Sequence, residues 1–210
     1  MTSITLSNSS NKEADNQEPL IKFKRTDDNR LLLDDKYTFG VLFVVIYEDN
    51  GKRYVLLEHR SSIDSKWPNK IVIPGETTEF DKDAKDVIGE SGSLSYKQME
   101  NIAYDTLIRG LEEELGTEVK EQRKSFNFMG YTKLEVNGKE FFAAVYLIYS
   151  GKFEPKNENN PDGEERHNKI IEFELDDELI EELKRDSPEH TIEILKKVLN
   201  LLNNEKQLRK

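Results

Sequence analysis

The stretch IRGLEEELG at residues 108–116 decides the fold of this chain, because it closes a helical pattern and carries three consecutive glutamates. Apolar side chains recur at helical spacing from residue 96 onward, which predicts one helix over residues 96–115. Gly116 follows as the expected stop. Glutamates so close to a helix C-terminus oppose the helix dipole, at about 0.3–1 kcal/mol each when exposed. The predicted buried stripe consists of Met99, Ala103, Thr106, Leu107, Leu111 and Leu115.

The three glutamates allow two interpretations at this point. Glu112, Glu113 and Glu114 form an oxygen-rich set of the kind that Mg²⁺ or Mn²⁺ prefers. The alternative is an ordinary acidic face in contact with solvent. On a helix, position 110 shares a face with Glu113 and Glu114, and Glu112 lies to one side.

The composition of the chain excludes several classes of protein and of functional site. The chain has 210 residues, enough for one domain with a full core, and no cysteine, which excludes disulfides, thiolate metal sites and cysteine nucleophiles. Its net charge of −11 disfavours extended nucleic-acid binding. Residues 1–18 are polar and are expected to form a disordered tail. No signal-peptide pattern and no apolar run of membrane-spanning length are present, so we expect a cytoplasmic protein.

The order of the remaining elements predicts an α/β architecture. Strands are expected at 37–49 and 52–60, joined by the Asn-Gly turn at 50–51, and a second hairpin turns at Asn137 and Gly138. Residues 77–98 look like an inserted loop. A last strand at 169–175 precedes two C-terminal helices. A single domain over 19–210 is predicted, with a mixed β-sheet between helical layers.

The motif at 109–116 resembles the signature of the Nudix hydrolase family. Its R, aliphatic, E, E and G positions are occupied here by Arg109, Leu111, Glu113, Glu114 and Gly116. The upstream stretch WPNKIVIPGE at 67–76 is similar to the strand and turn that lead into that motif. The resemblance implies a Nudix-type α/β/α sandwich over most of the chain.

Three departures from the family pattern concern the same motif. Gly110 stands where the family has its first helix glutamate, which is usually a metal ligand. Glu76 occupies the second position of the usual Gly-Gly pair, after Gly75. An insertion separates Gly75 from the helix, and the upstream glutamate of the motif has two candidates, Glu100 and Glu90.

The resemblance implies attack of water on a pyrophosphate bond in a nucleoside diphosphate linked to another group, a small-molecule substrate. Bound Mg²⁺ or Mn²⁺ would neutralise the diphosphate and lower the pKa of water. Glu113 and Glu114 are the principal expected ligands, and Arg109 is expected to orient a glutamate through a bidentate bond. Glu112 or a loop carboxylate would complete the site. Glu164 and Glu165 are the first loop candidates, with solvated loop residues as the alternative.

Two other functions remain open on the sequence alone. Gly110 and the interrupted motif also fit a catalytically degenerate Nudix-fold module that binds a nucleotide or a protein. A third hypothesis is a small acidic interaction protein whose glutamates form a surface patch. Trp67 and Phe80 are candidates to stack on a base, and the alternative for Trp67 is packing beneath the turn. Whether the chain forms a homodimer stays open.

Overall fold

The computed structural model describes residues 20–62, 67–89, 91–116, 126–152 and 169–208, and its centre is one long strand. This strand, β3 (Tyr37–Asp49), pairs in parallel with β9 (Lys139–Tyr149) and antiparallel with β4 (Lys52–His59). From Phe39 to Tyr47 every residue of β3 is buried, as expected for a strand covered on both faces.

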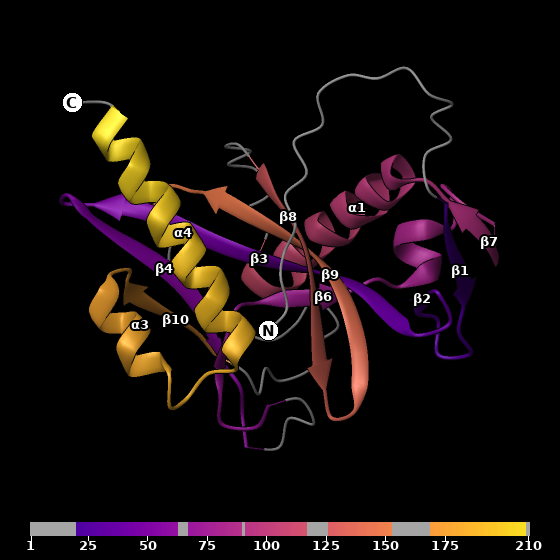
Figure 1. Cartoon of the computed structure of the whole chain (residues 1–210), viewed down its shortest axis with the longest axis horizontal. Helices are drawn as coiled ribbons and strands as arrows, with labels where there is room; N and C mark the ends of the chain where they lie inside the picture. The colour runs from indigo at the N-terminus through magenta and orange to yellow at the C-terminus, as the bar shows by residue number, and fades with distance from the viewer. Residues whose placement is uncertain (1–19, 63–66, 90, 117–125, 153–168, 209–210) are drawn as a thin grey trace, which may run out of the picture.

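In the part of the chain that the structure describes, ten strands join one mixed sheet, in which β3 is central (Figure 1). The order along its main path is β10-β4-β3-β2-β1-β7; β5 adds to β4, β6 adds to β3, and β8 continues the sheet beyond β9. Among the described pairs only β3–β9 is parallel. The remaining strands are β1 (Ile21–Arg25), β2 (Leu31–Leu33), β5 (Ile71–Val72), β6 (Gly75–Thr77), β7 (Ser91–Leu94), β8 (Phe126–Val136) and β10 (Lys169–Glu174).

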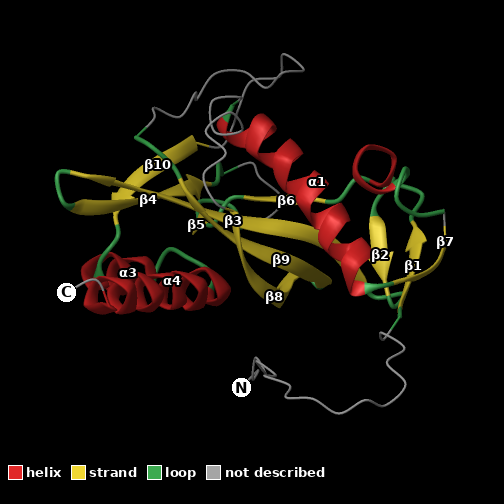
Figure 2. Ribbon diagram, turned by 90° about the horizontal axis from the view of Figure 1, so that it is seen from above, coloured by secondary structure: helices red, strands yellow, loops and turns green. Residues whose placement is uncertain are grey.

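Helices cover both faces of the sheet. The edge-on view shows α1 (Tyr96–Leu115) on one face and the pair α3 (Asp177–Leu183) and α4 (Glu189–Leu208) on the other (Figure 2). Alternate side chains of β3 contribute to the cores on the two faces of the sheet, because successive side chains of a strand point to opposite faces. Val41, Phe43 and Val45 belong to the core under α1, whereas Leu42, Val44 and Ile46 belong to the core under α3 and α4. The predicted α/β/α sandwich with a mixed sheet is confirmed.

Both predicted Asn-Gly hairpins are present. Asn50 and Gly51 have φ values of 51° and 78°, and Asn137 and Gly138 have 51° and 75°. Two successive residues with positive φ are what a tight two-residue hairpin requires, and Asn and Gly adopt that conformation at the lowest cost.

The segment expected as an inserted loop at about 77–98 contains regular elements. After β6 come a short π-helix, η1 (Phe80–Ala84), and then β7, which pairs with β1. Strands β1 and β2 were not anticipated, because residues 20–36 are mostly polar with only short apolar groups. The predicted tail at 1–18 lies outside the described residues. Among the helices that the structure describes, none combines the length and apolar character needed to cross a membrane.

Candidate active site

Helix α1 holds the glutamate motif in a fixed position. A capping box starts the helix: Ser95 Oγ accepts a hydrogen bond from Gln98 N at 3.3 Å, and Gln98 Oε1 accepts one from Ser95 N at 2.9 Å. All six residues of the predicted stripe are buried. The helix ends at Leu115, where Gly116 takes a φ of 86°. The motif therefore lies on the last two turns of a packed helix.

Arg109 is the centre of the site. Its Nε and Nη2 donate to the two carboxylate oxygens of Asp83 at 2.9 and 2.8 Å, and its Nη1 donates to Glu113 Oε2 at 2.9 Å. Nη2 also donates to the carbonyl oxygen of Thr77 at 2.8 Å. We expected a bidentate bond from Arg109 to a glutamate, but the bidentate partner is Asp83 of η1, and Glu113 receives a single hydrogen bond. Arg109 thus ties α1 to both β6 and η1.

Negative charge exceeds positive charge around this arginine. Glu76 and Glu79 also lie close, with carboxylate oxygens 3.5 and 3.4 Å from Arg109 Nη1. Lys82 Nζ lies 3.2 Å from Glu79 and 3.9 Å from Glu113. Four carboxylates, including that of Asp83, therefore surround two cationic side chains. Burial alone would lower the pKa of Arg109, but the hydrogen bond to Asp83 and the surrounding carboxylates hold that pKa above its ordinary value.

Glu76 is a largely buried member of this group of carboxylates. Its side chain is 16% exposed. Burial raises the pKa of Glu76, and the charges of Glu113 and Glu114 raise it further, although Arg109 and the hydrogen bond from Thr77 N oppose the shift. An additional cation nearby would stabilise the charged form of a carboxylate in this environment. Carboxylate oxygens are also the donors that Mg²⁺ and Mn²⁺ prefer, so the donor chemistry of these side chains suits a divalent ion.

The carboxylates are spread around Arg109 rather than gathered at one point. In the part of the chain that the structure describes, no group of three or more His, Cys, Asp or Glu residues is placed so that it could hold a metal ion. Binding of an ion would therefore require side-chain movement, which long glutamate side chains permit.

Gly110 faces Glu76 at close range. A Cβ atom placed on Gly110 would lie 2.8 Å from Glu76 Cβ, 3.2 Å from Phe43 Cε1 and 3.4 Å from Glu76 Cγ. The position where the resemblance led us to expect a helix glutamate is therefore next to a glutamate that comes from β6. Gly75 and Glu76, expected as the turn of the motif, are instead the first two residues of strand β6.

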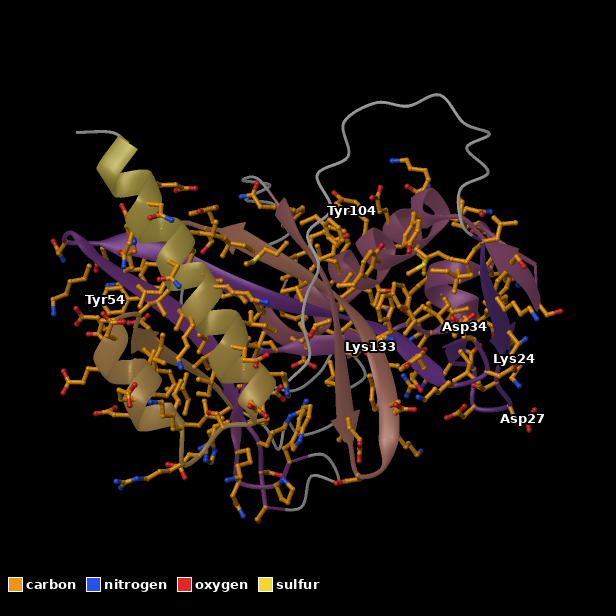
Figure 3. The ribbon with its side chains drawn as sticks, viewed as in Figure 1. Lys24, Asp27, Asp34, Tyr54, Tyr104 and Lys133 are labelled. Carbon is orange, nitrogen blue, oxygen red and sulfur yellow. The ribbon has the colours of Figure 1, made fainter. Side chains whose placement is uncertain are left out.

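The other glutamates of the motif differ in their surroundings. Glu113 belongs to the group around Arg109, and Glu114 lies close enough for its charge to affect Glu76. Glu112 lines a shallow hollow together with Lys82 and Tyr104, which projects from α1 (Figure 3). Glu164 and Glu165 lie outside the described residues. The roles predicted for all of these glutamates stay predictions.

The remaining candidates occupy other places. Glu100 is exposed near the start of α1, where it pairs with Lys97 at 3.8 Å, and Glu90 lies outside the described residues. Phe80 is buried in the core, so stacking on a base is wrong for this residue. Trp67 packs against His190 with ring centroids 4.8 Å apart.

Asp83 and Glu79 are the site residues that sequence reasoning missed. Both lie in the polar segment for which the sequence predicts an inserted loop. Asp83 is nonetheless buried, and its Oδ2 also accepts a hydrogen bond from Glu79 N at 2.8 Å. The available signal was the pair Phe80 and Ala84, whose spacing of four residues places two apolar side chains on one face of a helical turn.

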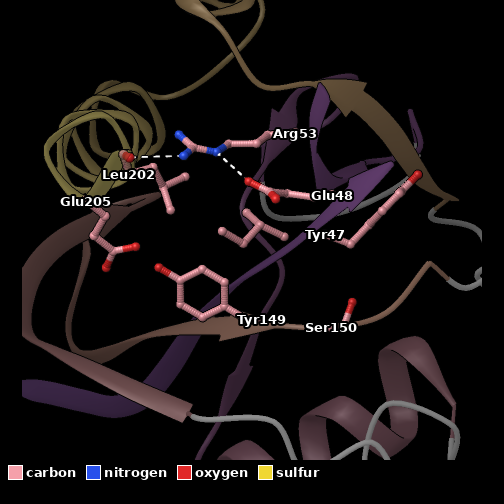
Figure 4. Close-up of a pocket in the computed structure, with 8 residues that line it drawn as sticks. Tyr47, Glu48, Arg53, Tyr149, Ser150, Leu202 and Glu205 are labelled. Atoms are coloured by element: carbon pink, nitrogen blue, oxygen red, sulfur yellow. Dashed lines mark hydrogen bonds and ion pairs between the residues drawn. The ribbon is translucent and has the colours of Figure 1, made fainter. Parts of the chain in front are cut away.

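A second hollow of about 410 Å³ lies between the ends of β3, β9 and α4 (Figure 4). Its cation, Arg53, is already engaged: Nε donates to Glu48 Oε1 at 3.1 Å, and Nη2 donates to the Leu202 carbonyl oxygen at 3.0 Å. Arg53 therefore anchors α4 to the sheet. Two carboxylates, those of Glu48 and Glu205, line this hollow beside Arg53, whereas four lie around Arg109.

Comparison with known proteins agrees with the architecture. Neither the models of protein families nor the sequences of curated proteins match this chain. Solved structures do match. The NUDIX domain of Shewanella oneidensis NrtR, solved with ADP ribose, has a TM-score of 0.53 and 12% identity, over 80% of this chain and 88% of that one.

Two further structures agree. A C. elegans Ap4A hydrolase has a TM-score of 0.52 and 16% identity, over 79% of this chain and 98% of that one. A NUDIX hydrolase from Alicyclobacillus acidocaldarius has a TM-score of 0.51 and 11% identity, over 77% and 90%. At such identities the similarity concerns the fold. The polypeptide therefore has the fold of the Nudix hydrolases.

Proposed function

We propose that this chain is a divalent-cation-dependent hydrolase that cleaves the pyrophosphate bond of a nucleoside diphosphate linked to another group. The observation that carries the proposal is the excess of carboxylates around Arg109, at the end of the helix that bears the motif. Two of the similar folds, named as an Ap4A hydrolase and as a domain bound to ADP ribose, support a nucleotide derivative as substrate.

The residues of this chain divide into ligands and positioning groups. In this proposal Glu113 and Glu114 hold Mg²⁺ or Mn²⁺, with Glu112 as a further candidate. A bound divalent ion would neutralise the diphosphate and lower the pKa of the attacking water. This neutralisation matters because a protein of net charge −11 otherwise repels a polyanion.

Arg109 acts by position rather than by contact with substrate. Its side chain is only 13% exposed, and its donors are already taken by Asp83, Glu113 and the carbonyl of Thr77. It therefore fixes the rotamer of Glu113 while η1 fixes Arg109. Glu164 and Glu165 remain candidates for the base that activates water.

The test is hydrolysis of ADP-ribose, nucleoside triphosphates and dinucleoside polyphosphates by the purified chain with Mg²⁺ or Mn²⁺. Glu113→Gln should lower activity by at least about 100-fold, because even outer partners of a metal site are worth 10–100-fold. The matched control is Glu193→Gln, which makes the same charge change at an exposed position of α4 on the opposite face of the sheet. Equal activity of wild type and Glu113→Gln would contradict the proposal.

The second candidate is a nucleotide-binding module without catalysis. It is favoured by the central place of Arg109, which already partners the carboxylates that would otherwise be available to an ion. A chain that hydrolyses nothing in the panel but is stabilised against heat by ADP-ribose would support this alternative.

A further inference from the structure

The contact between Gly110 and Glu76 joins two elements that are far apart in the sequence. Gly110 is buried inside α1, where glycine costs about 0.5–1 kcal/mol relative to alanine. The helix has no backbone need for it, since Gly110 does not have a positive φ. The proximity of Glu76 explains the glycine. Any Cβ atom at position 110 would lie 2.8 Å from Glu76 Cβ, which is closer than real Cβ atoms approach other atoms.

Glu76 has no freedom to retreat from the helix. It is the middle residue of β6 and pairs with Val41 of β3. That pairing is itself tight, because a Cβ on Gly40 would lie 2.6 Å from the carbonyl oxygen of Glu76. The position of Cβ in a side chain follows from the backbone. Glycine at 110 is therefore a condition for having any residue other than glycine at 76.

The carboxylate of Glu76 lies near the charged residues of the motif. It is directed at Arg109, with Oε1 3.5 Å from Nη1, and it lies within the electrostatic reach of Glu113 and Glu114. The space next to position 110 is thus filled by the Cβ and Cγ atoms of Glu76, which enters from the sheet side. Glu113 approaches the same arginine from the helix side.

We propose that Glu76 and Gly110 are an exchanged pair, in which β6 supplies the divalent-ion carboxylate that position 110 of α1 does not supply. Glu76 is then a ligand alongside Glu113 and Glu114, and Gly110 is the space that admits it. This inference rests on the proposed function, because the ion is the one that function requires.

The experiment compares the wild type with Glu76→Gln, Glu76→Gly, Gly110→Glu and the double variant Glu76→Gly/Gly110→Glu. Mn²⁺ affinity is measured by electron paramagnetic resonance on the free protein, the melting temperature by calorimetry, and hydrolysis by the substrate panel. Glu76→Gln keeps the shape of the side chain, so it should melt like the wild type yet bind Mn²⁺ at least about tenfold more weakly.

The exchanged variants test the steric half of the inference. Gly110→Glu should melt well below the wild type, because its Cβ would meet Glu76 Cβ at 2.8 Å. Removing Glu76 in the double variant should restore the melting temperature, and the carboxylate introduced on the helix should return Mn²⁺ affinity to within a few-fold of the wild type. Glu76→Gly alone should fold but bind Mn²⁺ weakly.

The outcomes separate this inference from the proposed function. Wild-type Mn²⁺ affinity in Glu76→Gln, with hydrolysis intact, would overturn the inference and leave the hydrolase standing. A double variant that binds Mn²⁺ no better than Glu76→Gly would also overturn it. Ion binding that depends on Glu76 without any hydrolysis would support the inference and refute the hydrolase. A wild type that binds no Mn²⁺ would overturn both.

Discussion

Replacing Gly110 by alanine sets two effects of opposite sign against each other. Alanine in a helix interior is favoured over glycine by about 0.5–1 kcal/mol. Against this, the new methyl group would lie 2.8 Å from Glu76 Cβ and 3.2 Å from Phe43 Cε1. Overpacking of this kind typically costs about 1–3 kcal/mol. Because the ladder between β6 and β3 prevents Glu76 from moving away, we expect the clash to win by about 1–2 kcal/mol.

Differential scanning calorimetry on the purified chain measures this balance. For a chain of this size, about 1–2 kcal/mol corresponds to a melting temperature lowered by roughly 2–8 °C. The control is the same substitution in a Glu76→Gly background, where the contact with Glu76 is absent and the sign should reverse toward slight stabilisation. A Gly110→Ala protein that melts at or above the wild-type temperature would refute the steric reasoning.

Two further predictions concern buried polar groups. Asp83→Ala should lower the unfolding free energy by about 3 kcal/mol, the low end for a broken buried pair, because Arg109 keeps Glu113 as a partner; a loss under about 1 kcal/mol in urea denaturation would contradict this. Burial lowers the pKa of His190 to about 4 from an ordinary 6.5. Between pH 6.5 and 4 the unfolded chain therefore binds a proton on His190 that the folded chain does not bind. Over this range the unfolding free energy should fall by up to about 3 kcal/mol as the pH drops. His190→Phe should lack this part of the decline when both proteins are unfolded in urea near neutral pH and in mild acid.

Regular elements with local signals were predictable from the sequence. The helix over residues 96–115 has the bounds that its apolar spacing predicted, because burial under a sheet demands one apolar stripe. The hairpins at Asn50-Gly51 and Asn137-Gly138 were predictable because the turn conformation itself selects these residues. In each case the cause lies within a few residues of its effect.

The geometry of the site was less predictable, since it depends on contacts between distant segments. The spacing of the motif identified Arg109 as a site residue. It did not identify Asp83, which lies outside the motif in a polar segment and accepts two hydrogen bonds from Arg109. Gly110 looked like the loss of a carboxylate. Only the approach of β6 shows that its missing side chain makes room for Glu76.

The parallel pairing of β3 with β9 has a consequence for the way the chain folds. Each strand belongs to its own local hairpin, β3 with β4 and β8 with β9, which need only short loops to form. The parallel ladder between the two hairpins runs from the pair Thr38–Phe141 to the pair Ile46–Tyr149. These partners are far apart in the sequence, so the long stretch of chain between them must close into a loop before the ladder can form. The cores under α1 and under α3 and α4 both include side chains of β3 and β9. We therefore expect both cores to form in one late, cooperative step, and amide exchange in β3 should require global unfolding.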